Sequence, residues 1–210
     1  MMSQVIGRKA FIELLQHKMS PTNIRSVMRA YTLAKYGHRE QSRDDGTRYF
    51  EHPKRVAILL IKAGIYDHEM IIAALLHDII EDSFILDVQI IKDTFGERVL
   101  KLIKALTKNN GENFIDYIQR LKNSGTSAQL IKLADRADNI GDLEGCTIKK
   151  AKKQLEETKQ IFLPWAKKLG NKSMMNISVH GWTPQYYLYS ALRVRCIQGY
   201  KKIYNPDNTV

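Results

Sequence analysis

One segment of the sequence is apolar on nearly every side and then becomes acidic. Residues 70–76 read MIIAALL, and the next six residues are His, Asp, Ile, Ile, Glu and Asp. Alanine and leucine are strong helix formers and the run exceeds normal strand length, so a helix is favoured over a buried strand. A helix that is apolar all round must lie at the centre of a fold, covered by its neighbours. This segment therefore demands a shell of further elements around it.

The rest of the sequence supplies that shell as helices. Apolar residues recur at three- and four-residue spacing, and no two-residue alternation of any length appears, which predicts an all-α bundle of about nine or ten helices. The expected helices are residues 6–16, 23–36, 53–64, 69–82, 87–95, 97–106, 112–123, 126–140, 149–169 and 183–204. Asp67 is expected to cap the central helix. Pro53 is expected at the first position of the helix over residues 53–64, with His52 just before its start. Pro164 is expected to bend the helix over residues 149–169. We expect a single domain over residues 1–210.

Charge and cysteine content narrow the functional class. The 33 Lys and Arg against 22 Asp and Glu give a net charge of +11, which favours polyanionic partners such as nucleic acid, acidic membrane or a phosphate-rich small molecule. The longest apolar run is too short to span a bilayer, and Arg8, Lys9 and Glu13 break any signal-like start. Cys146 and Cys196 form no metal or disulfide motif, so we expect a cytoplasmic protein without a membrane segment.

Acidic and imidazole groups end the central helix. Residues four apart share one helical face, so His77 with Glu81 and Asp78 with Asp82 should stack along one side. Buried charges are costly unless they are paired or bind a metal. A solvated helix end is the alternative, but acids near a helix C-terminus oppose its dipole and gain nothing there.

Two other segments carry matching groups. His52 lies in YFEHPKRVA, and Asp135 lies in KLADRADN with Asn139 on the same helical face. A lone histidine is more often structural than a ligand. Together, however, His52, His77, Asp78 and Asp135 provide two imidazoles and two carboxylates, a mixed set suited to Mn²⁺, Fe²⁺ or Zn²⁺. Such an ion can acidify water and polarise a phosphoryl oxygen.

These residues resemble the H…HD…D signature of the HD superfamily of metal-dependent phosphohydrolases. More closely, GHREQSRDDGTRYFEHPKRVA, AALLHDIIED, FGERVLKLIKALTK and IKLADRADNI resemble the hydrolase domain of RelA/SpoT homologues, which degrade the alarmone (p)ppGpp. The resemblance covers roughly residues 28–170, including LEETKQIFLPWAKKLG. The remaining length holds no synthetase or regulatory domain, so the resemblance implies a stand-alone small alarmone hydrolase.

The resemblance implies a role for each matching residue. The metal ligands would be His52, His77, Asp78 and Asp135, and the ion Mn²⁺. Glu81 and Asp82 match a catalytic pair that assists the attacking water. Arg43, Tyr49 and Asn139 match residues around the nucleotide, and Lys108 matches a lysine that could meet a phosphate, although a solvent-facing helix end explains it equally well. The implied reaction removes the 3′ pyrophosphate from guanosine tetra- or pentaphosphate.

Departures from the family pattern fall beside the expected nucleotide. Glu40 stands where the family has glycine, and Asp44 where it has a lysine next to Arg43, which places a negative charge beside a polyphosphate. Further changes occur at Ala137, Asp138, Gly141 and Asp142. The metal and catalytic residues are all kept, which implies retained hydrolysis. Another phosphorylated nucleotide, such as an adenine alarmone or the 2′-phosphate of NADPH, stays open as substrate, as does a catalytically silent module that binds RNA or protein.

The last expected helix mixes tyrosines with arginines and lysines. Such a composition can stack and neutralise RNA, but more often the tyrosines of an amphipathic helix pack on the core. No RNA-binding motif accompanies it, so we expect packing. The expected partner is a small nucleotide polyphosphate rather than nucleic acid, and the sequence sets no oligomeric state.

Overall fold

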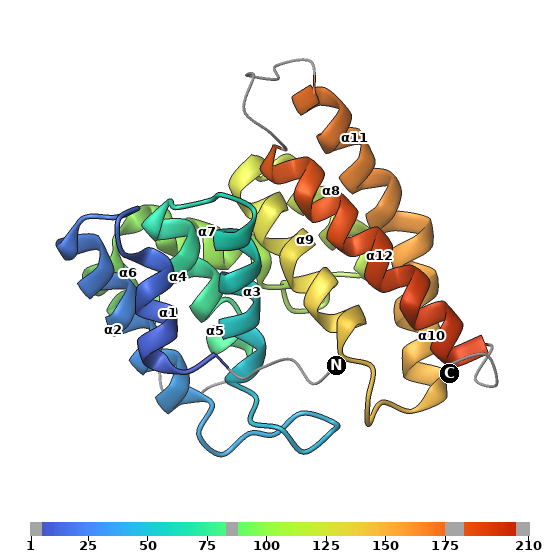
Figure 1. Cartoon of the computed structure of the whole chain (residues 1–210), viewed down its shortest axis with the longest axis horizontal. Coiled ribbons are helices and arrows are strands. Elements are labelled where there is room, and N and C mark those ends of the chain that lie inside the picture. The colour runs from blue at the N-terminus through green and yellow to red at the C-terminus, as the bar shows by residue number, and fades with distance from the viewer. Residues whose placement is uncertain (1–5, 83–87, 175–182, 205–210) are drawn as a thin grey trace.

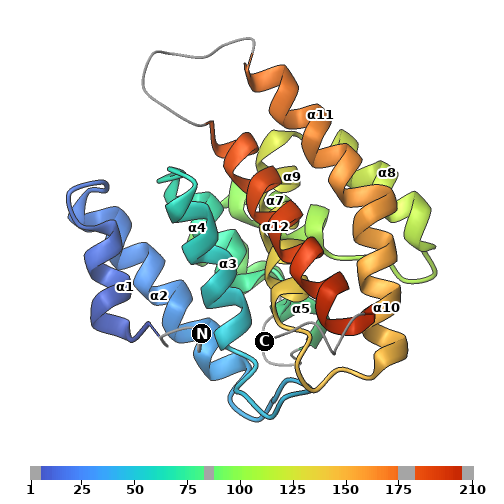
Figure 2. The same ribbon diagram turned by 45° about the vertical axis from the view of Figure 1, so that its right-hand side comes forward.

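The computed structural model describes residues 6–82, 88–174 and 183–204, and nearly all of its regular structure is helical (Figures 1 and 2). The elements are α1 (Arg8–Leu15), α2 (Pro21–Gly37), α3 (Glu51–Lys62), α4 (His68–Leu76), α5 (Ile79–Asp82), α6 (Val88–Phe95), α7 (Glu97–Leu106), α8 (Phe114–Asn123), α9 (Thr126–Gly141), α10 (Ile148–Glu157), the π-helix η1 (Thr158–Phe162), α11 (Leu163–Met174) and α12 (Pro184–Tyr204). Within these ranges the β-structure is one isolated bridge, between Ser42 and Arg48. The all-α prediction is confirmed. Counting α4 with α5, and α10, η1 and α11 as one run, gives ten helices in the described ranges.

Helix starts follow the capping residues of the sequence. Ser20 precedes Pro21, and its hydroxyl accepts a hydrogen bond from the backbone N–H of Asn23 at 3.2 Å. Asp67 caps α4 as expected, accepting from the N–H groups of Glu69 and Met70. These bonds satisfy donors that the first turn of a helix leaves without partners.

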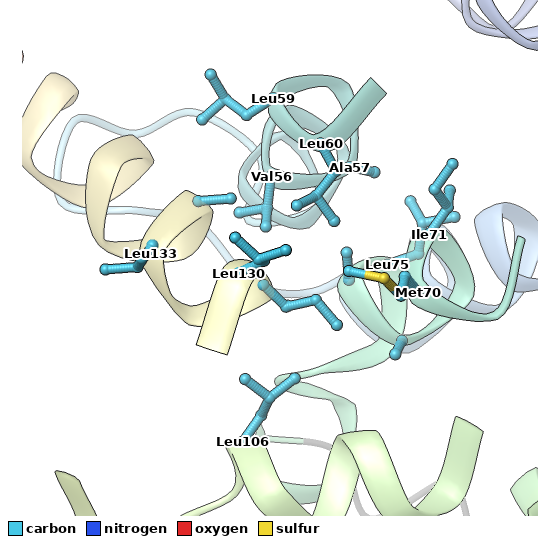
Figure 3. Close-up of a cluster of buried hydrophobic side chains, with 14 of the residues drawn as sticks. Val56, Ala57, Leu59, Leu60, Met70, Ile71, Leu75, Leu106, Leu130 and Leu133 are labelled. Carbon is cyan, nitrogen blue, oxygen red and sulfur yellow. The ribbon is translucent and has the colours of Figure 1, made fainter. Parts of the chain in front are cut away.

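The apolar run forms the buried centre of the bundle. Residues 70–76 are all buried in α4, which packs against α2, α3, α7 and α9. Figure 3 shows Met70, Ile71 and Leu75 of α4 beside Leu60 of α3 and Leu130 of α9. Because α3, α4 and α9 share this core, the polar residues at their ends are held at fixed positions relative to one another.

The structure corrects two details at those ends. The central helix does not continue through residues 69–82, because α4 ends at Leu76 and α5 begins at Ile79, with His77 and Asp78 between them. The predicted stacking of Glu81 on His77 and of Asp82 on Asp78 concerns side chains outside the described part of the structure and stays a prediction. Likewise, α3 begins at Glu51 rather than at Pro53, which places His52 inside the first turn and not at the mouth.

The C-terminal helices cover α9. Near Pro164, where we expected a bend, the structure has the π-helix η1, in which the N–H of Leu163 donates to the carbonyl of Thr158, five residues back. Proline has no N–H for the regular bond to residue 160, and a wider turn accommodates that loss. Helix α12 packs against α9 and α11. Tyr187, Tyr189 and Tyr200 are partly buried on the core, which confirms the packing prediction for these three, whereas Tyr204 is exposed. In the described ranges, every helix is too short or too polar to cross a bilayer.

Candidate metal centre and adjoining pocket

Four predicted ligands from three parts of the chain converge. His52 comes from α3, His77 and Asp78 from the break between α4 and α5, and Asp135 from α9. His52 Nε2 lies 3.1 Å from Asp135 Oδ1 and 3.6 Å from Asp78 Oδ2. His77 Nε2 lies 3.0 Å from Asp78 Oδ1 and 3.7 Å from Asp135 Oδ1. The nitrogen and oxygen atoms thus surround one small volume, as ligands of a single ion do.

The hydrogen bonds of the two rings leave their Nε2 atoms free for a ligand role. His77 Nδ1 is 2.9 Å from the carbonyl oxygen of Ala74, and His52 Nδ1 is 2.8 Å from Asp138 Oδ2. A carbonyl or carboxylate oxygen only accepts, so each Nδ1 carries a proton, and Nε2 is the ring atom left to bind a cation once it has lost any proton of its own. His77 Nε2 is buried without a hydrogen-bond partner. Metal-binding histidines are held in this way, and the donor set fits a divalent cation.

The electrostatics favour a positive charge between the carboxylates. Burial alone lowers the pKa of His52, but its hydrogen bonds to Asp135 and Asp138 outweigh burial and raise that pKa to about 9. Burial works to raise the pKa of Asp135. The nearby Lys132 ammonium, 2.8 Å from Oδ2, and the two imidazoles nevertheless hold that pKa well below its ordinary value. A proton or a metal cation is therefore stabilised at the centre of the cluster.

Asp138 and Arg55 are functional candidates that sequence reasoning missed. Asp138 is only 2% exposed and accepts the Nδ1 proton of His52. Arg55 Nε donates to both oxygens of Asp138, at 2.8 and 3.1 Å, and Arg55 Nη2 lies 2.5 Å from Asp142 Oδ2. The sequence interpretation placed Asp138 beside the nucleotide, whereas it lies behind a metal-ligand candidate. The sequence holds only a partial signal: Arg55 follows His52 by three residues and Asp138 follows Asp135 by three, so each pair shares a helical face, but this spacing does not set which way Asp138 points.

A pocket of about 490 Å³ adjoins the cluster. Its lining residues are Ser42, Arg43, Asp44, Tyr49, Phe114, Arg136, Asn139, Cys146, Lys150, Lys153, Gln154 and Glu157. Arg43 Nη2 donates to Asn139 Oδ1 at 3.0 Å, and Asn139 Nδ2 donates to Asp135 Oδ1 at 2.7 Å. The Tyr49 hydroxyl donates to Asp78 Oδ2 at 2.9 Å. Three predicted nucleotide contacts, Arg43, Tyr49 and Asn139, are thus brought together beside the metal-ligand candidates.

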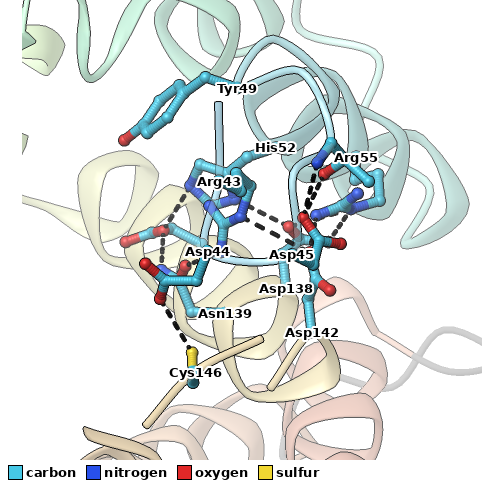
Figure 4. Close-up of polar contacts among 12 residues, drawn as sticks. Arg43, Asp44, Asp45, Tyr49, His52, Arg55, Asp138, Asn139, Asp142 and Cys146 are labelled. Carbon is cyan, nitrogen blue, oxygen red and sulfur yellow. Dashed lines mark hydrogen bonds and ion pairs between the residues drawn. The ribbon is translucent and has the colours of Figure 1, made fainter. Parts of the chain in front are cut away.

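Asp44 does not present the unpaired negative charge that the sequence interpretation assigned to it. Its Oδ2 lies 2.5 Å from Lys150 Nζ and 3.1 Å from Cys146 Sγ, which donates to it (Figure 4). Lys150 and Cys146 belong to the stretch that joins α9 to α10 and opens α10. Pairing with Lys150 offsets the charge of Asp44 at the pocket rim, so the repulsion expected toward a polyphosphate is weakened.

Of the remaining residues, Lys108 and Glu40 lie outside this arrangement. Lys108 is exposed after the end of α7 and does not line the pocket. Glu40 is exposed and pairs with Arg39 at 3.0 Å. Glu81 and Asp82 belong to α5, directly after His77 and Asp78, but their side chains fall outside the described part of the structure.

Comparison with known proteins places this geometry in a family. The family model described as "HD domain" matches residues 30–172, more than half of the chain. A relative from Aquifex aeolicus, named guanosine-3′,5′-bis(diphosphate) 3′-pyrophosphohydrolase, is 38% identical over 83% of this chain and 25% of its own length. The bifunctional (p)ppGpp synthase/hydrolase SpoT of Escherichia coli is 32% identical over 75% of this chain and 24% of its own length. The chain spans about a quarter of these relatives.

A solved structure agrees in fold. It is described as a metazoan ortholog of SpoT that hydrolyzes ppGpp, and it superposes with a TM-score of 0.57 and 26% sequence identity over 84% of this chain and 94% of its own. All four clustered ligand candidates lie within the residues that the family model matches. The chain therefore belongs to the HD domain family.

Proposed function

We propose that this protein hydrolyses the 3′ pyrophosphate of ppGpp and pppGpp, using one Mn²⁺ ion. The observation that carries the proposal is the convergence of His52, His77, Asp78 and Asp135, with both Nε2 atoms facing two carboxylates. The similarity to relatives named as ppGpp pyrophosphohydrolases supports the choice of substrate. In the reaction, water attacks phosphorus, the bond from phosphorus to the 3′ oxygen breaks, and GDP or GTP leaves with pyrophosphate as the second product.

In this proposal each group has a task that suits its position. A divalent cation in the cluster supplies Lewis acidity toward a phosphoryl group and makes water more acidic. Glu81 and Asp82 orient the water and accept its proton, a role supported by their position three and four residues after Asp78 in the chain. Tyr49 holds the Asp78 carboxylate through its hydroxyl.

The pocket supports recognition of a polyanion. Arg43, Arg136, Lys150 and Lys153 bring four cations to its lining, against the acids Asp44 and Glu157. Arginine forks match phosphate oxygens, and long-range attraction from the net charge of +11 would speed capture of a highly anionic nucleotide. We propose that Arg43 and Asn139 hold the nucleotide and that Lys108, outside the pocket, plays at most a distant electrostatic part. We further propose that residues 1–210 work as one domain in the cytoplasm.

Product analysis tests the proposal directly. The purified full chain is stripped of metal, reloaded with Mn²⁺, Zn²⁺ or Mg²⁺ in parallel, and supplied with ppGpp, pppGpp, the adenine analogue of ppGpp or NADPH. We expect pyrophosphate and GDP from ppGpp with Mn²⁺, and no turnover by the Asp78→Asn variant. Orthophosphate release from NADPH, or equal turnover of guanine and adenine alarmones, would replace the proposed substrate. No turnover of any nucleotide with any metal would contradict the enzymatic assignment.

A further inference from the structure

Helix α12 lies outside the family match yet contacts the helix that builds the candidate metal centre. The family model covers residues 30–172, whereas α12 spans Pro184–Tyr204. α12 packs along α9, which carries Asp135 and Asp138 (Figure 2). Leu188, Leu192 and Cys196 are buried on α12. The centre is therefore flanked by an element that the family match does not include.

The end of α9 that faces α12 is rich in negative charge. Its last turn carries Asp138, Asp142 follows directly after the helix, and no basic residue lies in the last turn of α9 itself. Acids at a helix C-terminus oppose the dipole and need cations from elsewhere. Arg55 of α3 supplies one, through its bonds to both carboxylates.

Arg195 of α12 supplies a second cation at the same place. Its Nη1 donates to the carbonyl oxygen of Ala137 at 2.7 Å and lies 3.9 Å from Asp138 Oδ1. Asp138 is thereby enclosed by three groups: the His52 ring, Arg55 and Arg195. A carboxylate that is 2% exposed needs such partners, because burying an unpaired charge is costly.

The fit of Arg195 against α9 depends on a residue without a side chain. A Cβ atom at Gly141 would lie 3.1 Å from both Cδ and Nη1 of Arg195. The guanidinium therefore occupies space that most residues at position 141 would fill. Gly199 of α12 likewise leaves room for a neighbouring helix, because a Cβ atom there would lie 2.8 Å from Cδ2 of Leu155 in α10.

We propose that α12 is part of the metal centre, with Arg195 as a positioning residue that acts through Asp138 on His52. Arg55 holds the Asp138 carboxylate through hydrogen bonds to both oxygens, and Arg195, held by the Ala137 carbonyl, adds a second guanidinium charge 3.9 Å from it. The carboxylate fixes the Nδ1 proton of His52, and Nε2 then points at Asp78 and Asp135. This inference rests on the proposed divalent-metal site but not on the identity of the nucleotide. Groups that orient a metal-binding histidine typically change metal affinity by 10- to 100-fold when they are removed.

The experiment measures Mn²⁺ affinity in the full chain by titration calorimetry after metal removal, without any nucleotide. Arg195→Gln is compared with Arg193→Gln, which removes the same charge from an exposed position of the same helix. We expect Arg195→Gln to weaken Mn²⁺ binding about 10-fold, Arg193→Gln to leave it unchanged, and Arg195→Lys to recover part of the loss. Circular dichroism checks that each variant is folded. If Arg195→Gln does not fold, the comparison is made between Arg195→Lys and Arg193→Lys instead.

A double variant separates a positioning role from general destabilisation. If Arg195 acts through Asp138, adding Arg195→Gln to Asp138→Asn weakens Mn²⁺ binding little further than Asp138→Asn alone. Additive losses, or equal affinity of Arg195→Gln and wild type, overturn the inference. A wild-type chain that binds no divalent metal overturns both this inference and the proposed function. Tight metal binding without turnover of ppGpp overturns only the proposed substrate, and the affinity comparison then still decides on Arg195.

Discussion

Arg43 Nη2 and Asn139 Oδ1 are joined by a hydrogen bond of 3.0 Å between residues 96 positions apart in sequence. Because Asn139 also donates to Asp135 at 2.7 Å, the pocket and the candidate metal centre share one chain of side chains. A nucleotide bound to Arg43 would therefore be linked to Asp135, a metal-ligand candidate, through two hydrogen bonds.

Arg43→Ala should mainly raise KM, by roughly tenfold, because it removes a charge-assisted contact made in both the ground and the transition state. Asn139→Ala should lower kcat as well, since it also releases Asp135. Steady-state kinetics with ppGpp at saturating Mn²⁺ compare the two. A fall in kcat without a change of KM for Arg43→Ala would assign Arg43 to the chemistry instead.

His77→Ala and Asp135→Ala should each abolish turnover and metal retention. Loss of supporting groups alone costs up to about 100-fold in affinity, so loss of a ligand exceeds that. Metal content is measured by mass spectrometry next to ppGpp hydrolysis, with His68→Ala as a histidine control outside the cluster. Full metal occupancy in the His77→Ala protein would remove His77 from the ligand set.

Glu81→Gln should lower kcat and leave metal content intact, because it keeps the size of the side chain and removes a base needed when water loses its proton. Single-turnover rates with pre-bound ppGpp isolate this step. A Glu81→Gln protein that turns over at the wild-type rate but binds Mn²⁺ weakly would make Glu81 a metal-centre residue.

The pKa of His52, raised from 6.5 to about 9, sets a pH window. A group whose pKa is higher in the folded state adds stability that is complete below its unfolded pKa and is lost as pH rises through the folded value. In the presence of a chelator, Tm should therefore fall between pH 6.5 and about 9, and a His52→Gln protein should lack this decline. Because Mn²⁺ must displace the His52 proton, its affinity should rise over the same window. If Tm measured with the chelator stayed constant from pH 6.5 to about 9, His52 would not be protonated in the folded protein.

Asp44→Asn should lower KM for an anionic nucleotide roughly two- to fivefold by releasing Lys150, and added salt should reduce the effect. Asp44→Lys should act in the same direction. Glu13→Gln, an equal charge change on exposed α1, serves as control and should have no effect. If Asp44→Asn instead raises KM, the carboxylate binds the substrate, and the ion pair with Lys150 is not its main role.

The extent of the helices and the four ligand candidates were predictable, because apolar spacing and short motifs carry that information directly. His52, His77, Asp78 and Asp135 each sit at the end of, or within, a segment whose helical nature is evident from sequence. The helix break at His77 was not predictable, since no glycine or proline marks it. At the break, His77 Nδ1 bonds locally to the Ala74 carbonyl three residues back, while Nε2 faces a carboxylate from another part of the chain, and helical spacing does not predict either contact.

The role of Asp138 escaped sequence reasoning for a related reason. An aspartate one position before Asn139 can face either the nucleotide or the core, and helical spacing alone does not distinguish the two. The Asp138 carboxylate faces the core because His52 and Arg55 of α3 hydrogen-bond to it there, with Arg195 of α12 nearby at 3.9 Å. Asp44 was misinterpreted in the same way, because its partner Lys150 lies 106 positions away.

The His77 ring contacts both the end of α4, through the Ala74 carbonyl, and the candidate cation site. Hydrogen exchange of the amides at this helix end should therefore depend on cation binding. The imidazole satisfies a carbonyl near the end of the helix it terminates, while its other nitrogen faces the carboxylates. Each local opening of the last turn of α4 frees the ring, so cation binding must suppress that opening. Protection of the amides around residues 76–79 should consequently rise with Mn²⁺ concentration, and the innermost, most apolar helix of the bundle becomes the part of the backbone that senses the occupancy of the site.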